Sequence, residues 1–219
     1  MTADTRAAAQ SQRCQWARSG NAAYRTYHDC EWGVAVHDEH RLFEFLVLEG
    51  AQAGLSWSTI LNKRAGYRKA FAAFNPRKVA AFDKLKIDEL VADPAIVRHR
   101  GKIESTVSNA RCFLEIQTTF GSFDQFVWDF VDGIPVQNSW KHGDDVPTHS
   151  PQSDALSKEL KRRGFKFAGT TIMYAFMQAI GMVNDHTTDC FRWAELCNAS
   201  VPVKAQDSNN FPIPRGQKA

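Results

Sequence analysis

The residue of this sequence best placed to do chemistry is Glu49. It follows an apolar run, residues 42–48, and the helical repeat places it in line with the buried face of that run. The face is marked by Leu42, Phe45 and Leu46. A carboxylate in line with a core face costs free energy unless another group pairs with it. Glu49 is therefore either a structural acid held by an arginine or a backbone N–H, the commoner case, or a functional group in a pocket.

Aromatic residues accompany this acid. Trp57 follows Glu49 across a turn broken by Gly50 and Gly54. An acid and an indole joined in this way could form the floor and wall of a pocket for a flat cationic ligand. More aromatic residues lie upstream among histidine and acidic residues, and they predict either a half-exposed aromatic wall or ordinary core. These residues are Trp16, Tyr24, Tyr27 and Trp32.

Two cysteines and two histidines are candidate metal ligands. They are Cys14, His28, His186 and Cys190. Two thiols and two imidazoles suit a closed tetrahedral zinc site, which would join the two ends of the chain and, with no position for water, would be structural. The spacing matches no zinc-finger pattern, and a buried cysteine beside ordinary histidines is the alternative.

A basic turn within residues 93–103 is the candidate for binding an anion. It leads into a helix predicted to start near Gly101, and the exposed backbone N–H groups of such a turn favour a phosphate. Arg98, Arg100 and Lys102 add positive charge, although a solvated charged face is the alternative. The sequence has no Gly-rich nucleotide fingerprint, P-loop, nucleophile elbow or HExxH motif.

The elements that must position these residues are predicted to be helices. Apolar periodicity and capping residues predict helices over 39–52, 56–74, 76–82, 87–91, 101 to at least 114, 122–131, 153–163 and 170–182. The predicted N-caps include Asp38, Ser56, Ser122 and Ser153, and Gly164 is predicted to follow the C-cap of its helix. Residues 132–152 are predicted to be a loop, and no strand alternation stands out. The predicted class is therefore all-α.

Composition sets broad limits on the chain. A length of 219 residues with 43% hydrophobic residues suits one helical domain, over 13–192, or two small lobes that share a core. Tails are predicted over 1–12 and 193–219. Five widely spaced cysteines do not form a disulfide framework, and no signal peptide or membrane span is found, which favours the cytoplasm. A net charge of +3 permits nucleic-acid binding without arguing for it.

Several stretches resemble the 3-methyladenine DNA glycosylase I family of the helix-hairpin-helix superfamily. The resemblance runs from about Cys14 to Cys190, and the interval from Cys14 to Tyr24, which contains Trp16, is one residue longer than usual. The matching stretches are 27–33 (YHDCEWG), 48–57 (LEGAQAGLSW), 96–103 (IVRHRGKI), 153–158 (SDALSK), 163–167 (RGFKF), 169–172 (GTTI) and 183–186 (VNDH).

The resemblance implies a fold, a function and a set of roles. It implies a helix-hairpin-helix glycosylase fold, and an enzyme that flips 3-methyladenine out of alkylated double-stranded DNA and hydrolyses its glycosidic bond. It implies that Glu49 receives the base and that Trp57 stacks on it, within a pocket lined by Tyr27, Tyr24, Trp32 and Trp16. It implies one structural zinc ion, held by Cys14, His28, His186 and Cys190. It implies that the hairpin grips the DNA backbone, with Arg98, Arg100, Gly101 and Lys102 as the candidate contacts.

Two further expectations and two rival functions complete the prediction. Leu55 is the candidate for filling the gap that the flipped base leaves, and no lysine is placed to form a Schiff base, so no strand cleavage is expected. No obligate protein partner is implied. One rival is a non-catalytic lesion sensor with the same hairpin and aromatic cage, and the other is a zinc-dependent hydrolase, which needs an open metal position.

Overall fold

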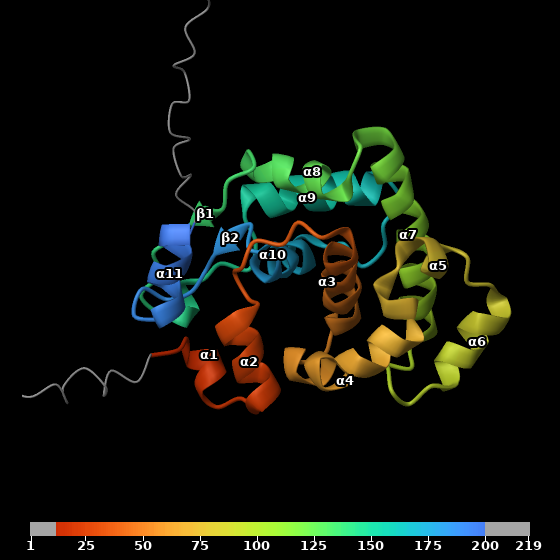
Figure 1. The fold of residues 1–219 in the computed structure, drawn as a ribbon, viewed down its shortest axis with the longest axis horizontal. Helices are drawn as coiled ribbons and strands as arrows, with labels where there is room; N and C mark the ends of the chain where they lie inside the picture. The colour runs from red at the N-terminus through yellow and green to blue at the C-terminus, as the bar shows by residue number, and fades with distance from the viewer. Residues whose placement is uncertain (1–11, 200–219) are drawn as a thin grey trace, which may run out of the picture.

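The protein, described here over residues 12–199 in a computed structural model, is helical along most of that length (Figure 1). This confirms the predicted all-α class. Of the tails predicted over 1–12 and 193–219, residues 1–11 and 200–219 lie outside the described residues. The α-helices are α1 (Gln15–Arg18), α2 (Ala22–Cys30), α3 (Glu39–Gln52), α4 (Trp57–Ala70), α5 (Pro76–Ala80), α6 (Lys84–Ala92), α7 (Arg100–Phe120), α8 (Phe123–Trp128), α9 (Pro151–Arg162), α10 (Thr170–Ala179) and α11 (Phe191–Ala199). Short 3₁₀ helices are η2 (Ala72–Phe74), η3 (Asp129–Val131) and η4 (Gly143–Asp145).

Helix starts agree with the sequence where the capping side chain is local. Asp38, Ser56 and Ser122 each accept a hydrogen bond from the backbone N–H three residues on, at the starts of α3, α4 and α8. The cap predicted at Ser153 is wrong. Ser150 caps α9, since Pro151 fits the first helical position and Ser153 completes the capping box with Ser150.

Several boundaries differ from the prediction, and the helix predicted over 170–182 ends at Ala179. The helix predicted over 56–74 stops at Ala70, because the backbone turns left-handed from Ala72 to Phe74, with φ values of 51°, 53° and 55°. Helix α6 starts at Lys84, earlier than predicted, because Asp83 caps it. Residues 193–199, assigned by sequence to a tail, belong to α11.

One strand of a short pair lies within the region predicted to be a loop. Strand β1 (Val136–Gln137) pairs in parallel with β2 (Val183–Asn184), with Val136 opposite Val183. Two residues are too few for an alternating pattern to show in the sequence. The pair matters because it attaches the 132–150 segment to the residues that precede His186.

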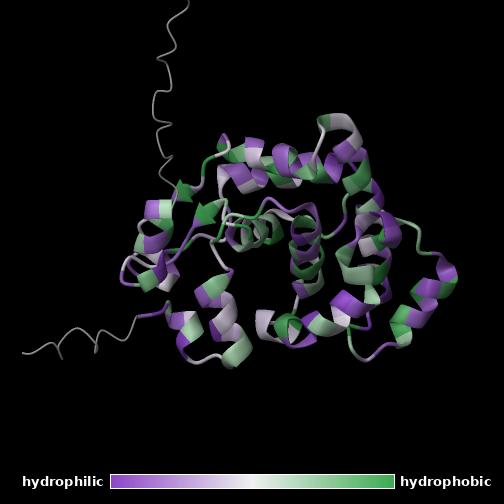
Figure 2. Cartoon of the chain, viewed as in Figure 1, coloured by the Kyte–Doolittle hydropathy of each residue, from purple (hydrophilic) through white to green (hydrophobic). Residues whose placement is uncertain are grey.

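The core surrounds α3, which contacts α10, α4, α7 and α8. Figure 1 shows α3 and α10 in the middle of the molecule, with α8 and α9 above them and α4 below. Nearly every side chain of α3 from Leu42 to Ala51 is buried, Glu44 and Glu49 included. Figure 2 shows hydrophilic segments along the outer helices α6, α7 and α9. None of the described helices is long and apolar enough to cross a membrane.

The two ends of the described chain meet on one side of the molecule. Figure 1 shows α1 and α2 near α11 and the strand pair. The backbone N–H of Phe191 donates to the carbonyl oxygen of Gln12 at 3.0 Å. This meeting brings Cys14 close to His186 and Cys190.

Candidate functional site

A single cavity of about 340 Å³ collects the predicted acid and all five predicted aromatic residues. The acid comes from the last turn of α3, and Trp57 from the first position of α4. The N-terminal segment supplies the remaining aromatics. The predicted residues in its lining are Trp16, Tyr24, Tyr27, Trp32, Glu49 and Trp57.

Glu49 is buried without a partner for its charge. It is 4% exposed, and no other described residue makes a hydrogen bond or an ion pair with its carboxylate. Burial alone raises the pKa of Glu49 to about 8. The alternative of a structural acid held by an arginine or a backbone N–H does not describe this residue.

Glu44, one turn and a half earlier on α3, shows what a structural acid looks like in the same helix. It is 2% exposed, and Arg64 Nε and Arg68 Nη2 donate to its Oε1 at 2.8 and 2.9 Å. Burial acts to raise the pKa of Glu44, but the hydrogen bonds and charges of the two arginines outweigh it and hold that pKa below its ordinary value. The contrast identifies Glu49 as the acid whose burial the fold leaves uncompensated.

The aromatic walls are built from edge-to-face and tilted ring contacts. The Trp16 ring lies 5.1 Å from the rings of Tyr24 and Trp32, at interplanar angles of 87° and 85°. On the other side, the Tyr27 and Trp57 rings lie 5.1 Å apart. The Trp57 Nε1–H is buried and has no hydrogen-bond partner among the described residues. An unpaired indole N–H and an unpaired carboxyl in one cavity are groups that a ligand can satisfy.

Burial also affects the tyrosine of this wall. Burial and the charge of Glu49 raise the pKa of Tyr27 well above its ordinary value. The phenol therefore stays protonated across the physiological range and can donate a hydrogen bond.

The cavity has lining residues that the sequence did not indicate. Polar ones are Gln52 on α3, Gln178 on α10 and Asp185 after β2, and the 132–150 segment adds Gly143 and Val146. Gln52 could have been found from the helical repeat, since it lies one turn after Glu49. The others come from segments that only the fold brings together.

Asp185 holds this side of the cavity in place. Its Oδ1 accepts hydrogen bonds from Asn138 Nδ2 and Trp140 Nε1, both at 2.7 Å. Its Oδ2 accepts from Tyr174 Oη and Gln178 Nε2, both at 2.8 Å. Four donors from two distant segments therefore tie α10 to the loop that carries Gly143.

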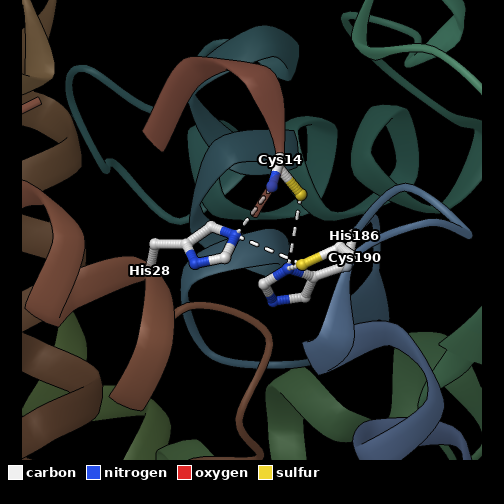
Figure 3. A group of neighbouring side chains, drawn as sticks. All are labelled: Cys14, His28, His186 and Cys190. Atoms are coloured by element: carbon white, nitrogen blue, oxygen red, sulfur yellow. Dashed lines mark hydrogen bonds between the residues drawn. The ribbon is translucent and has the colours of Figure 1, made fainter. Parts of the chain in front are cut away.

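The four predicted metal ligands form one buried cluster (Figure 3). Their ligand atoms all lie within 4.8 Å of one another. The sulfur atoms of Cys14 and Cys190 each lie 3.4 Å from His186 Nδ1, and Cys190 Sγ lies 3.5 Å from His28 Nε2. The Cys190 sulfur and burial both raise the pKa of the Cys14 thiol. The second thiol of the pair therefore loses its proton only when a cation offsets the two negative charges. This donor set could hold a metal ion in that way.

The second nitrogen of each histidine also has a partner. His28 Nδ1 lies 2.8 Å from Asp29 Oδ1, and Arg13 holds that carboxylate with three hydrogen bonds. His186 Nε2 lies 3.1 Å from the Trp32 carbonyl oxygen. A carboxylate or carbonyl behind each imidazole is the usual arrangement for fixing a metal-binding histidine.

The basic turn lies on the surface, between α6 and α7. Arg98 and Arg100 are exposed, and Arg100 Nη2 lies 2.7 Å from Asp88 Oδ1 on α6. His99 caps α7 through its ring, accepting from the Lys102 backbone N–H at 3.2 Å. Gly101, in the first turn of α7, is half-buried.

The last two candidates for DNA contact lie in different environments. Leu55 is 41% exposed at the turn between α3 and α4. Lys102 is 9% exposed, and its Nζ donates to two backbone carbonyl oxygens. Lys102 therefore does not share the surface of Arg98 and Arg100.

Comparisons with known proteins identify the family of this chain. A family model described as methyladenine glycosylase matches residues 16–193. The DNA-3-methyladenine glycosylase 1 of Escherichia coli (strain K12) is 50% identical over 179 residues, which cover 82% of this chain and 95% of the relative.

The fold is also similar to that of solved structures of 3-methyladenine DNA glycosylase I. A crystal structure of 3-methyladenine DNA glycosylase I has a TM-score of 0.80 and 52% sequence identity, over 82% of this chain and 98% of the other. A variant of 3-methyladenine DNA glycosylase I in complex with 3-methyladenine has a TM-score of 0.77 and 40% identity, over 78% and 92% of the two chains. The aromatic cavity with its buried acid therefore lies in a chain that belongs to the methyladenine glycosylase family.

Proposed function

We propose that this protein excises 3-methyladenine from alkylated double-stranded DNA by hydrolysing its N-glycosidic bond. The observation that carries the proposal is the unpaired, buried carboxyl of Glu49 within an aromatic cavity of about 340 Å³. Relatives that bear the name DNA-3-methyladenine glycosylase support it.

The cavity suits a flat, positively charged base. A base inside a duplex is out of reach, so the nucleotide must rotate out of the stack before it can enter. The indole of Trp57 offers a stacking face, and cations are attracted to such faces. Tyr27 and the Trp57 Nε1–H offer hydrogen-bond donors, and Glu49 offers an acceptor once it is ionised. Neutral adenine lacks the charge that pairs with an ionised Glu49.

The reaction needs little acid catalysis, because N3-methylation gives the base a positive charge. The glycosidic electron pair returns to the base, which leaves as neutral 3-methyladenine. Water adds its hydroxyl to C1′ of the sugar and releases one proton. The Glu49 carboxylate stabilises the positive charge that the sugar develops on the way. No lysine is found among the residues that line the cavity, so base removal without strand cleavage is the expected outcome.

We propose that α6, the basic turn and α7 form the helix-hairpin-helix element that holds the DNA backbone. The exposed Arg98 and Arg100 and the Gly101 backbone N–H lie at the start of α7, where the helix dipole favours a phosphate. Leu55, exposed on the turn beside the cavity, is proposed to fill the gap left by the flipped base.

We propose that the cluster of Cys14, His28, His186 and Cys190 binds one structural zinc ion. Tetrahedral bonds to zinc place a sulfur and a nitrogen ligand about 3.6 Å apart, close to the 3.4 and 3.5 Å separations of this cluster. The ion, when bound, supplies no reaction step, because four protein ligands leave no position for water. Its role is to hold the N-terminal segment against the residues after β2.

The test is release of free 3-methyladenine from methylated duplex DNA by the wild type and by Glu49→Gln. We expect release by the wild type, and a loss of roughly 100-fold or more in the variant, since a carboxylate that stabilises the transition state is removed. Binding of undamaged duplex is expected to stay the same and serves as the control. A folded wild type that releases no base would support the lesion sensor instead. Equal losses of excision and of duplex binding would make Glu49 a folding residue.

A further inference from the structure

The environment of Lys102 differs from that of a surface DNA contact. Its Nζ donates hydrogen bonds to the carbonyl oxygen of Ala51 at 2.8 Å and to that of Ala53 at 2.6 Å. Burial lowers the pKa of Lys102, so the two carbonyl groups must offset the cost of placing an ammonium there. The side chain therefore points into the protein, toward the end of α3.

The two carbonyl groups belong to the turn that joins Glu49 to Trp57. Ala51 lies in the last turn of α3 and Ala53 is its C-cap residue. The last carbonyl groups of a helix have no partner within the helix, and that end carries a partial negative charge. The ammonium of Lys102 donates hydrogen bonds to these carbonyl groups and places a positive charge at the negative end of the helix. Lys102 therefore fixes the backbone at the point where α3 ends.

The same turn forms one side of a hollow next to the base cavity. Glu49 and Gln52 line both spaces, and Gly54 and Leu55 line the second one opposite Ile172 of α10. Gly54 has a φ of +75°, a conformation that favours glycine and sets the direction in which Leu55 leaves the turn. Movement of this turn would shift the acid, the stacking indole and the exposed leucine relative to one another.

A second buried polar residue of α7 acts in a similar way on the segment between α9 and α10. Asn109 Nδ2 donates to the Lys166 carbonyl oxygen, and the Lys166 N–H donates to Asn109 Oδ1, both at 2.9 Å. The next residue, Phe167, faces Gly50 of α3. Through side chains two turns apart, helix α7 thus holds both the end of α3 and the segment that packs against Gly50 of α3.

We propose that Lys102 is a positioning residue for base excision, which fixes the turn over 51–55 so that Glu49, Trp57 and Leu55 act on one nucleotide. The inference rests on the proposed glycosylase function. Because Lys102 lies in the first turn of α7, it also links the basic turn that faces DNA to the cavity that receives the base. It is not proposed to contact a phosphate.

The test compares Lys102→Met with the wild type in single-turnover excision. Methionine keeps the apolar stem and removes both hydrogen bonds. We expect the excision rate to fall about 100-fold, since small misplacements of reacting groups have effects of this size. Affinity for undamaged duplex DNA is expected to stay within about twofold, with an unchanged salt dependence, because no phosphate contact is lost.

A matched control is Arg111→Met on the same helix. Arg111 Nε also donates to a backbone carbonyl, that of Ala80 at 3.0 Å, but away from the cavity. We expect its excision rate to match the wild type even if its melting temperature falls. Should Lys102→Met fail to fold, Lys102→Gln carries the test, because glutamine removes the charge and keeps an amide donor. Its excision rate is expected to fall while its DNA affinity holds.

Two outcomes overturn the inference. One is excision by the folded Lys102 variants at the wild-type rate. The other is weaker binding of undamaged DNA with a salt slope smaller by about one, which marks a lost phosphate contact. A wild type that releases no 3-methyladenine is a separate result, since it removes the proposed function itself.

Discussion

Two glutamates of one helix show what a single side chain can and cannot reveal from sequence. The apolar repeat predicted that Glu49 faces the core, and the structure confirms its burial. The repeat could not show that the arginines of α4 pair with Glu44 and leave Glu49 alone. Such pairing depends on which helix packs alongside, and the sequence of α3 does not contain that information.

The stability of the protein is expected to depend on pH through Glu49. Its pKa is about 8 in the folded chain against an ordinary value of 4.5. Between these values the folded state keeps a proton that the unfolded state has lost, so the free energy of unfolding falls as pH rises, by about 1.4 kcal/mol per pH unit. Glu49→Gln is expected to lack this fall. Denaturant melts from pH 5 to pH 8 measure the difference.

Glu44→Gln is the control for that experiment, with the opposite sign. The pKa of Glu44 lies below its ordinary value, so its ionised form stabilises the fold at neutral pH and loses that effect only in acid. Glu44→Gln should therefore be less stable than the wild type at pH 7. If Glu49→Gln shows the same slope as the wild type from pH 5 to pH 8, the raised pKa of Glu49 is wrong.

Trp57 is expected to control the selectivity for 3-methyladenine over unmodified adenine, and not the affinity for DNA. Trp57→Ala removes the stacking face and its attraction for a cation, a contribution of about 1–3 kcal/mol for a base on an aromatic ring. The ratio of excision rates for 3-methyladenine and for unmodified adenine should fall by about tenfold or more. Competition between methylated and unmodified duplexes measures that ratio. An unchanged ratio would remove the stacking role.

At the scale of elements, the residues that cap a helix could be predicted from sequence. The side of a helix that faces solvent or protein could not. Asp38, Ser56 and Ser122 could be named as caps because a cap acts on its own helix. The basic residues at the start of α7 read alike in sequence, yet Arg98 faces solvent and Lys102 faces the protein. The difference arises because α3 ends beside α7, and α7 contains no sign of that neighbour.

The stability of the α1–α2 segment is expected to depend on the proposed zinc site. Cys190→Ser removes one of the four proposed ligands, so the purified variant should contain less than one zinc ion per chain by elemental analysis. The melting temperature should fall by about 10 °C, as expected for a loss of several kcal/mol in a chain of this size. Cys30→Ser, at an exposed cysteine outside the cluster, is the control. A Cys190→Ser variant that keeps a full zinc ion contradicts the four-ligand site.

At the scale of the whole molecule, the cavity combines predictable and unpredictable parts. The acid and the aromatics were found from sequence because they have distinctive chemistry. Gly143, Val146 and Asp185 were not, because they reach the cavity only through the pairing of β1 with β2. A net charge of +3 also does not show which basic residues are available to bind DNA. Many of them pair with neighbouring acids, as Arg162 does with Glu159.

The exposed basic turn is expected to set the overall affinity for DNA without regard to damage. Arg98→Ala should weaken the binding of methylated and undamaged duplex by the same factor and reduce the salt slope by about one. The excision rate at saturating DNA should stay close to that of the wild type. Fluorescence anisotropy across a range of salt concentrations measures the slope. A loss confined to methylated DNA would place Arg98 in damage recognition instead.

The wall shared by the cavity and the cysteine–histidine cluster links the base site to the ends of the described chain. Cys14 lines the cavity while belonging to the cluster, and Thr187 lines it next to His186. A base bound there stabilises only conformations in which both ends stay folded. Amide hydrogen exchange should therefore slow together in α1 and after β2 when 3-methyladenine binds, so that segments more than 150 residues apart in sequence open and close as one cooperative unit.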